Sequence, residues 1–380
     1  MRFPEFEGEW EKCKVSDLLD FYSTNSLCWD KLEYGTTNIQ NLHYGLIHVG
    51  LPTMVDIDKD NLPNIIDGNV PKNYVLCKEG DIAFADASED TNEVAKAVEF
   101  YNLNGKKVVC GLHTIHGRDN KNKTVVGYKG YAFSSTSFHH QIRRIAQGTK
   151  IYSINSKNFS ECYVGIPSKD EQQKIADLLR LIDDRIATQN KLIEKLESLI
   201  KGIRHDIFNG IQGEVLALSN IADIYQPQTI SSSDLTTEGY WVYGANGIIG
   251  KYKEYNHETE QICITCRGNT CGTVNYTQPK VWITGNSMVI NTDKYQRQVN
   301  KRFLFHYLSS YNFNSIVSGS GQPQIVRTPL EKIKVVLPTI EKQVRIANSI
   351  DIVSEKIDTE SLVLRLLENQ KQYLLRQMFI

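Results

Sequence analysis

Two polar, basic stretches in the first half of the chain carry side chains that can hydrogen-bond to nucleic-acid bases and phosphates. They are His113-Thr-Ile-His-Gly-Arg-Asp-Asn-Lys-Asn-Lys123 and Ser134-Ser-Thr-Ser-Phe-His-His-Gln-Ile-Arg-Arg144. Arginine can bind a base edge through two hydrogen bonds, whereas lysine, serine and backbone N–H groups suit phosphates. The candidate contacts in these stretches are Arg118, Lys121, Lys123, His139, Arg143 and Arg144.

Three glycine-containing segments in the second half offer the same chemistry. They are Tyr243-Gly-Ala-Asn-Gly247, Arg267-Gly-Asn-Thr270 and Ser318-Gly-Ser-Gly-Gln-Pro-Gln324. Asparagine and glutamine can bind an adenine edge through two hydrogen bonds. The candidate contacts here are Asn246, Arg267, Asn269, Gln322 and Gln324. Taken singly, each segment also has the composition of an ordinary solvated turn. The interpretation as DNA contacts therefore depends on the organisation of the whole chain.

The sequence offers no catalytic constellation. It contains no phosphate-binding loop of the Walker type, no glycine-rich dinucleotide fingerprint and no nucleophile elbow. Asp119 and Lys121 have the acid-x-Lys spacing of some nucleases, but no Pro-Asp pair stands one strand upstream. We therefore assign no catalytic residue.

Cysteines and histidines do not form a convincing metal motif. Cys263 and Cys266 have metal-ligand spacing with Cys271 close behind, but no fourth ligand follows nearby. The alternation around Cys263 is typical of a strand that buries small cysteines. The pairs His113/His116 and His139/His140 lack a carboxylate or cysteine complement. We predict no metal and no cofactor on this chain.

Composition and charge restrict the class of protein. The formal net charge is −1, so bulk charge does not indicate a nucleic-acid binder. No stretch of about 18 apolar residues predicts a membrane span, and the first residues lack the apolar core of a secretory signal. We expect a cytoplasmic protein, in which the eight cysteines are reduced thiols.

An internal repeat indicates which elements position these residues. Residues 166–208 align without a gap on residues 337–379 at a constant offset of 171, and nine positions are identical. The identical pairs are Pro167/Pro338, Gln172/Gln343, Ile175/Ile346, Ala176/Ala347, Ile186/Ile357, Thr188/Thr359, Leu196/Leu367, Glu197/Glu368 and Phe208/Phe379. Such a repeat marks a duplicated structural unit, so the chain reads as variable block, long helix, variable block, long helix.

Each copy of the repeat predicts a long helix with one apolar stripe. The stripe residues alternate at spacings of four and three, which is the a/d pattern of a coiled coil. The two stripes are Ile175, Leu179, Ile182, Ile186, Gln189, Ile193 and Leu196, and Ile346, Ile350, Val353, Ile357, Glu360, Leu364 and Leu367. Each helix would run for about 40 residues, or roughly 60 Å at 1.5 Å per residue. We predict that the stripes pack on each other, and the chain connection favours an antiparallel pair.

The repeat defines four segments. Residues 1–165 and 213–334 are mixed, strand-rich blocks that resemble each other at their edges and diverge inside, and residues 166–212 and 335–380 are helical. Val15-Ser-Asp-Leu-Leu19, for example, parallels Leu218-Ser-Asn-Ile-Ala222. The predicted fold class is α+β, with two mixed α/β domains, an antiparallel coiled coil of two long helices and a pseudo-twofold internal repeat.

Several motifs resemble those of one known family. They are Gly-Ile-Pro-Ser-Lys-Asp-Glu-Gln-Gln-Lys-Ile-Ala at 165–176, Leu-Pro-Thr-Ile-Glu-Lys-Gln-Val-Arg-Ile-Ala at 337–347, Phe3-Pro-Glu-Phe-Glu-Gly-Glu-Trp10, Gly80-Asp-Ile-Ala-Phe84, Tyr243-Gly-Ala-Asn-Gly-Ile-Ile-Gly250 and Gly319-Ser-Gly-Gln-Pro-Gln324. As a set they make the chain similar, over essentially its whole length, to the specificity subunits of type I restriction–modification systems. The first block departs from the pattern at Gly148, which no glutamine follows.

The resemblance implies a function without chemistry of its own. The variable blocks would be target recognition domains that each read half of a split, asymmetric DNA target. The helices would set the spacer between the halves and dock two methyltransferase subunits. Those subunits would carry S-adenosylmethionine, and restriction subunits would add translocation and cleavage with ATP and Mg. A helix of roughly 60 Å exceeds one B-DNA turn of about 34–36 Å, which fits this role.

Two alternatives remain open from the residues alone. One is a protein with two ligand domains on a coiled-coil strut and no DNA role, and the other is a nuclease using Asp119 and Lys121. Charged helix faces away from the stripe are candidate docks for partner subunits, although solvated faces look the same. The docking candidates are Lys174, Arg180, Arg185, Arg345 and Lys356.

Overall fold

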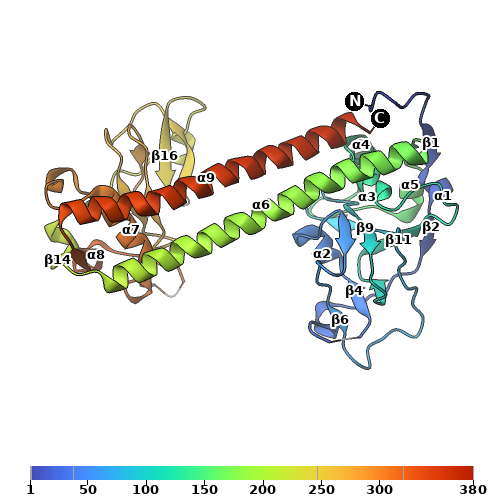
Figure 1. Ribbon diagram of the computed structural model, residues 1–380, viewed down its shortest axis with the longest axis horizontal. Coiled ribbons are helices and arrows are strands. Elements are labelled where there is room, and N and C mark those ends of the chain that lie inside the picture. The colour runs from blue at the N-terminus through green and yellow to red at the C-terminus, as the bar shows by residue number, and fades with distance from the viewer. Residues whose placement is uncertain (1, 37, 246, 320, 380) are drawn as a thin grey trace. The chain divides into compact units, whose positions relative to one another are not determined.

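The computed structural model describes residues 2–36, 38–245, 247–319 and 321–379. Its contacts divide the chain into two compact units, drawn in Figure 1. Unit 1 comprises Met1–Asn190 with Leu362–Ile380, and unit 2 comprises Lys191–Ser361. The two long helices, α6 (Lys169–Gly210) and α9 (Ile340–Gln377), each contribute one part to each unit.

Unit 1 contains a mixed sheet of five strands in the order β2-β11-β7-β9-β5 and a smaller sheet in the order β10-β4-β6-β3. Its strands are β1 (Glu11–Lys14), β2 (Asp20–Tyr22), β3 (Leu32–Glu33), β4 (Gln40–Leu42), β5 (Met54–Asp56), β6 (Asn64–Ile65), β7 (Ile82–Ala85), β8 (Ala87–Ser88), β9 (Ala97–Asn102), β10 (Val108–Cys110), β11 (Thr114–Arg118), β12 (Tyr152–Ser153) and β13 (Tyr163–Ile166). Its shorter helices are α1 (Val15–Leu18), η1 (Trp29–Lys31), α2 (Tyr44–Val49), α3 (Tyr128–Phe133), α4 (Thr136–Ile145) and α5 (Ser156–Ser160).

Unit 2 contains a sheet in the order β15-β21-β18-β19 and another in the order β17-β16-β20. Its strands are β14 (Glu214–Ala217), β15 (Asp223–Tyr225), β16 (Tyr240–Gly244), β17 (Gly247–Tyr252), β18 (Ile262–Thr265), β19 (Val274–Tyr276), β20 (Trp282–Ile283), β21 (Ser287–Asn291) and β22 (Lys334–Leu337). Its shorter helices are η2 (Leu218–Asn220), η3 (Ser232–Asp234), η4 (Asp293–Tyr295), α7 (Lys301–Ser310), η5 (Phe313–Ser315) and α8 (Arg327–Glu331).

The two units repeat one topology, which confirms the predicted internal repeat. The order β2-β11-β7-β9 in unit 1 matches β15-β21-β18-β19 in unit 2. In both sheets the strand that comes first along the chain (β2 or β15) lies beside the strand that comes last (β11 or β21). The two strands next in the sheet (β7 and β9, or β18 and β19) come between these in the chain. In both units an antiparallel pair, β1 with β13 and β14 with β22, joins the start of the block to the strand before a long helix. The interiors differ, as predicted.

The predicted apolar stripe is the buried face of both helices. In α6, Ile175, Leu179 and Ile182 are buried, and in α9, Ile350 and Glu360 are buried. Most positions between the stripe residues are exposed. The remaining stripe residues are half-buried; these are Ile186, Gln189, Ile193, Leu196, Ile346, Val353, Ile357, Leu364 and Leu367. The 4-3 spacing therefore identified the packed face correctly.

The helices run antiparallel within each unit. In unit 1, Ile175 and Leu179 near the start of α6 share a core with Leu374 near the end of α9 and with Met378 just after it. Figure 1 shows these parts of the helices side by side. In unit 2 the relation is reversed, since Phe208 near the end of α6 packs on the core that contains residues near the start of α9. The predicted antiparallel pairing is confirmed in both units.

An identical glutamine makes the same three hydrogen bonds in each unit. The Oε1 of Gln172 accepts the backbone N–H of Val125 at 2.9 Å, and its Nε2 donates to the carbonyls of Pro167 and Lys123. The Oε1 of Gln343 accepts the N–H of Asn300 at 2.8 Å, and its Nε2 donates to Pro338 and to Gln298. Each side chain is 1% exposed, so these bonds join each block to its helix in a site shielded from solvent.

An aromatic contact repeats beside each glutamine. Phe379, just beyond the end of α9, packs against Tyr128 with ring centroids 5.9 Å apart, and Phe208 at the end of α6 packs against Phe303 at 5.6 Å. Tyr128 and Phe303 each lie three residues after the backbone N–H that the glutamine accepts. The sequence-identical pair Phe208/Phe379 therefore makes equivalent contacts in both units.

We expect Gln172→Ala and Gln343→Ala each to lower the free energy of unfolding by roughly 1–3 kcal/mol, because each leaves a buried N–H and buried carbonyls unpaired. Urea unfolding, with hydrogen exchange at Val125 and Asn300, would measure the loss. Gln173→Ala is the matched control, since Gln173 is exposed one position away, and it should change stability by about 0.5 kcal/mol or less. Equal effects of control and test variants would contradict the account.

Candidate nucleic-acid interface

Arg118 lies at the end of β11 in a network centred on a buried carboxylate. Its Nε and Nη2 donate to the two oxygens of Asp81, each at 2.7 Å, and its guanidinium lies 4.7 Å from the centroid of the Tyr22 ring. His116 binds the same carboxylate through Nε2 at 2.7 Å. Burial would raise the pKa of Asp81, but the hydrogen bonds from Arg118 and His116 hold it below its usual value. Arg118 is thus a fixed and mostly buried cation, with 12% of its side chain exposed.

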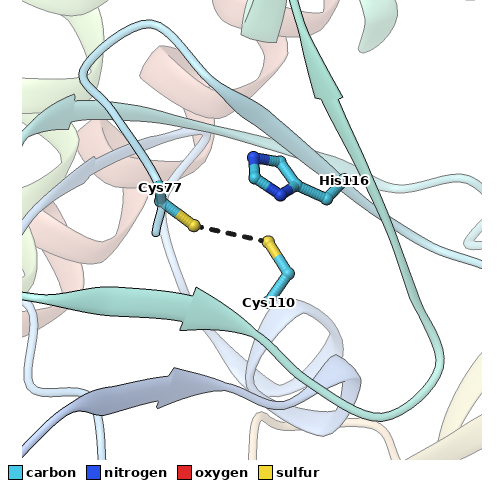
Figure 2. A group of neighbouring side chains, drawn as sticks. All are labelled: Cys77, Cys110 and His116. Atoms are coloured by element: carbon cyan, nitrogen blue, oxygen red, sulfur yellow. Dashed lines mark hydrogen bonds between the residues drawn. The ribbon is translucent and has the colours of Figure 1, made fainter. Parts of the chain in front are cut away.

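The fold also supplies partners for His116 that the sequence did not suggest. Cys77 and Cys110 lie beside it, and Figure 2 shows the two sulfur atoms next to the imidazole ring. The three residues are far apart in the sequence and have no metal-motif spacing. Sequence reasoning therefore found no complement for His116.

A cavity of about 710 Å³ opens beside Arg118. Besides Arg118, its lining includes Lys72, Asn73, Tyr74 and Lys78. These residues combine cations, an amide and an aromatic ring, which is the chemistry of a nucleic-acid contact. Sequence reasoning missed them, although Lys72-Asn-Tyr74 follows Pro71 in a polar segment that could have been noted.

Lys121 and Lys123 lie in the turn after β11. The Nζ of Lys121 donates to the carbonyl of Asp17 at 2.8 Å, and Lys123 pairs with Glu11 at 2.6 Å. Asp119 accepts hydrogen bonds from the backbone N–H and hydroxyl of Thr124. Both side chains of the acid-x-Lys pair are thus engaged in hydrogen bonds with other parts of the chain, which gives the nuclease alternative no support.

His139, Arg143 and Arg144 lie on helix α4, a helix that the sequence analysis did not predict. The helix forms because Ser135 caps it, accepting the N–H of Phe138 at 3.3 Å, and because Phe138 and Ile142 bury one face. Arg143 donates to His140 and to Asn92. Burial lowers the pKa of His139, and the neighbouring Arg143 lowers it further. Arg144 is exposed.

In unit 2 the structure brings four of the predicted contacts onto two adjoining loops. Arg267 pairs with Gln324 in an isolated bridge, and the N–H of Gly268 donates to the carbonyl of Pro323 at 3.0 Å. Arg267, Asn269, Gln322 and Gln324 are all exposed. Asn246, the fifth candidate, lies outside the described residues.

A cavity of about 370 Å³ adjoins these loops. Arg267 and Gln324 line it together with Gln226 and Arg327, two residues that the sequence did not single out. Gln226 lies 17 residues before the nearest of the glycine-containing motifs, and Arg327 lies three residues after Gln324, outside the motif. Guanidinium and amide groups thus converge at one cavity.

The five candidate docking residues occupy the outer faces of the helices. Three of them form ion pairs within the chain: Lys174 with Glu5, Arg180 with Asp177 and Lys356 with Glu360. Arg185 and Arg345 are exposed. The docking role remains a prediction for all five.

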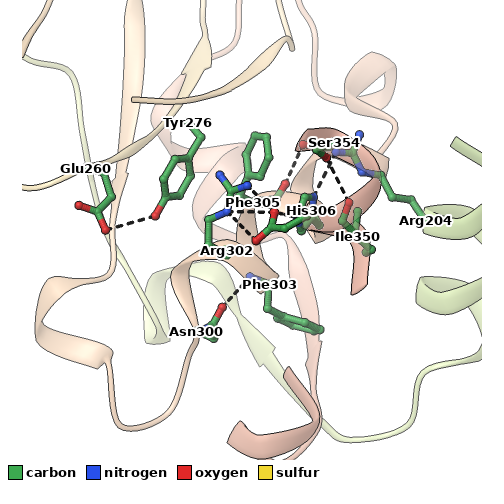
Figure 3. Close-up of polar contacts among 12 residues, drawn as sticks. Arg204, Glu260, Tyr276, Asn300, Arg302, Phe303, Phe305, His306, Ile350 and Ser354 are labelled. Carbon is green, nitrogen blue, oxygen red and sulfur yellow. Dashed lines mark hydrogen bonds and ion pairs between the residues drawn. The ribbon is translucent and has the colours of Figure 1, made fainter. Parts of the chain in front are cut away.

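In unit 2 a polar network fixes the block to both helices (Figure 3). Arg302 and His306 of α7 bind the carboxylate of Asp351 on α9, His306 through Nε2 at 2.7 Å. Arg204 of α6 donates to Nδ1 of His306 at 3.1 Å. Because Nδ1 accepts from an arginine, His306 is neutral with its proton on Nε2. Burial lowers its pKa to about 4, and the positive charges of Arg204 and Arg302 act in the same direction.

Unit 1 has a counterpart of this network. The hydroxyl of Tyr131 donates to Asp183 of α6 at 2.9 Å, and Lys371 of α9 pairs with the same carboxylate at 2.6 Å. Tyr131 and His306 each lie six residues after the N–H that the glutamine accepts. In both units an aspartate on one long helix binds a side chain of the block, and a cation from the other helix completes the network.

The family model of the type I restriction modification DNA specificity domain matches the chain twice, over residues 7–198 and 211–369. The type I restriction enzyme EcoprrI specificity subunit from Escherichia coli is 29% identical over 154 residues, which are 39% of this chain and only 37% of that protein. A protein of Methanocaldococcus jannaschii assigned as the MjaX specificity subunit is 25% identical over 392 aligned positions, covering 93% of this chain and 89% of its own length.

Two solved structures share the fold. The crystal structure of the S subunit of a type I restriction–modification system from M. genitalium matches with a TM-score of 0.63 at 18% identity, covering 100% of this chain and 99% of that chain. A chain from work on complex assembly and conformational transition of the type I R-M system gives a TM-score of 0.59 at 13% identity, covering 98% of this chain and 97% of that chain.

Within the described residues, no helix has the length and apolar content needed to cross a bilayer.

The neutral state of His306 predicts a pH dependence. Its folded pKa of about 4 lies below the ordinary value of 6.5, so the unfolded chain takes up a proton first as pH falls. The contribution of His306 to the free energy of unfolding is therefore fully present above pH 6.5 and is lost as the pH falls from 6.5 to 4. At pH 5 the loss is about 2 kcal/mol. Urea unfolding at pH 7 and pH 5 should show that His306→Gln loses less free energy of unfolding between the two pH values than the wild type does. His205→Gln, a change at an exposed position of α6, should lose as much as the wild type. The same loss in all three proteins would contradict a neutral, buried His306.

Proposed function

Because this chain belongs to the family of type I restriction–modification DNA specificity domains and carries two copies of that domain, we propose that it selects the DNA sequence on which a type I complex acts. The observation that carries the proposal is one sheet topology repeated with two different sets of polar loops. Residues 1–165 and 213–334 would be the two recognition domains. Each would read one half of a bipartite, asymmetric target.

The polar surfaces of the two units support separate readers. The Arg118 cavity of unit 1 offers lysines, an asparagine and a tyrosine, whereas the cavity of unit 2 offers Arg267, Arg327, Gln226 and Gln324. Arginine and glutamine suit guanine and adenine edges, and lysine suits phosphate. Two sites that differ in chemistry would read two different half-sites, so the whole target would be asymmetric.

The long helices would act as the spacer between the half-sites. With 42 and 38 residues they correspond to about 63 Å and 57 Å of helix at 1.5 Å per residue. The anchors of each block to both helices, through Gln172, Gln343, Asp183 and Asp351, would transmit helix length to the readers.

The partners would supply the chemistry. Two modification subunits would dock on the helices, where Arg185 and Arg345 are exposed, and would bind S-adenosylmethionine to methylate adenine. Restriction subunits would use ATP and Mg for translocation and cleavage. This chain would contribute DNA contacts alone, and we expect it in the cytoplasm with the DNA.

Arg267→Ala should alter the half-site read by unit 2 and leave the other half-site and the gap unchanged. Loss of a bidentate base contact costs about 1–3 kcal/mol, or roughly 5–150-fold in discrimination at one position. Methylation sequencing of cells that express the variant with its modification subunits would measure this. Lys280→Ala, an exposed cation of the same unit, is the control. A change in both half-sites, or in neither, would argue against separate readers.

Inserting one heptad into each long helix, in frame with the stripe, should lengthen the unread gap. Seven residues add about 10 Å at 1.5 Å per residue, or roughly three base pairs at 3.4 Å each. Both half-sites should persist in the methylation map. Seven residues inserted at the exposed turn of Asn104 and Gly105 should leave the gap unchanged. An unchanged gap after the helix insertion would refute the spacer role.

A further inference from the structure

We propose that Cys77, Cys110 and His116 form a binding site for a zinc-class metal ion inside unit 1. Their ligand atoms all lie within 4.8 Å of one another, and the three residues are buried. Two thiolates and one imidazole are the ligands that zinc prefers. The proposal concerns folding and surface geometry, and it does not depend on the DNA role of the chain.

The distance between the sulfur atoms fits a shared ion. The Sγ atoms of Cys77 and Cys110 are 3.6 Å apart. Two sulfurs bound at about 2.3 Å to one tetrahedral ion lie roughly 3.8 Å from each other. The cysteines therefore need almost no movement to bind the same ion.

His116 provides an independent observation that points to a ligand. Its side chain is 0% exposed, and its Nδ1 has no hydrogen-bond partner among the described residues. Its Nε2 binds Asp81 at 2.7 Å. Figure 2 shows a ring nitrogen turned toward the two sulfurs. A carboxylate that holds one imidazole nitrogen while the other faces an ion is the arrangement of metal-bound histidines.

The charges of the site also balance for a divalent ion. Two thiolates neutralise the ion, and the carboxylate of Asp81 is neutralised by the bidentate contact with Arg118. A buried group of this kind carries no net charge, which avoids the cost of an unpaired buried charge. Among the described residues no fourth His, Cys, Asp or Glu joins the group, so a water or an amide or carbonyl oxygen would complete a tetrahedron.

The ion would hold together three segments of the first block. Cys77 precedes β7, Cys110 ends β10 and His116 lies in β11. Binding at Nδ1 fixes the proton of His116 on Nε2, which then donates to Asp81 and so keeps that carboxylate aligned with Arg118. The metal site would thereby position the guanidinium of Arg118 at the cavity that Arg118 lines.

Elemental analysis of the full-length chain, purified under reducing conditions without chelator, tests the proposal. We expect about one zinc per chain, and after replacement by Co²⁺ a tetrahedral spectrum with thiolate charge-transfer bands. Cys77→Ser, Cys110→Ser and His116→Gln should each lose most of the bound metal. The double variant Cys263→Ser and Cys266→Ser is the matched control, because it removes the C-x-x-C spacing, and it should retain the metal.

Absence of metal from the purified chain, together with no Zn²⁺ or Co²⁺ uptake by the reduced wild type, would overturn the proposal. Loss of metal only in the Cys263/Cys266 variant would also overturn it, as would a Cys77–Cys110 disulfide in place of the metal. If a ligand variant fails to fold, the Co²⁺ spectrum of the wild type still decides. Charge-transfer intensity for two thiolates supports the site, and its absence counts against it.

Discussion

The rest of the structure depends on one packing constraint: the start of each long helix shares a core with the end of the other. In unit 1 the core contains Ile175 and Leu179 of α6 together with Leu374 of α9 and Met378 just beyond its end. Removing this buried apolar surface from water stabilises the unit, so the first block cannot complete its core without residues from the end of the chain. The same holds in unit 2 with the helices exchanged. Each block is thereby joined to both helices.

Buried polar contacts add geometry to this apolar packing. The hydrogen bonds of Gln172 and Gln343 and the ion pairs of Asp183 and Asp351 are satisfied only when the block and both helices are in register. A displacement of one residue along a helix would leave these largely buried groups without hydrogen-bond partners, which costs free energy. The apolar stripe supplies stability, and the polar anchors determine the position of each block on its helices.

The helical scaffold could be predicted from the sequence because a heptad stripe and a gapless repeat are regular patterns. The stripe from Ile175 onward and its antiparallel partner agree with the structure. The helical state of α4 was missed because its buried face consists of only Phe138 and Ile142 within a polar stretch. Gln172 and Gln343 were visible as an identical pair, but the backbone groups of the block that they bind lie more than forty residues away along the chain.

Contacts that join distant segments could not be predicted. Arg118 meets Asp81, and His116 meets Cys77 and Cys110, through sheet pairing that leaves no spacing signature in the sequence. Of the unit 2 contacts, Arg267 and Gln324 were found because glycine-containing motifs marked them, whereas Gln226 and Arg327 carried no such mark. A single residue near a strand end gains its neighbours only when the sheet forms.

A genome-wide methylation map of cells with and without this gene tests the central claim most directly. The account predicts one adenine-methylated motif of two dissimilar halves around a fixed unread gap, present with the gene and absent without it. A map that does not change when the gene is removed, or a lost motif that is continuous, would contradict a pair of readers held at a set separation.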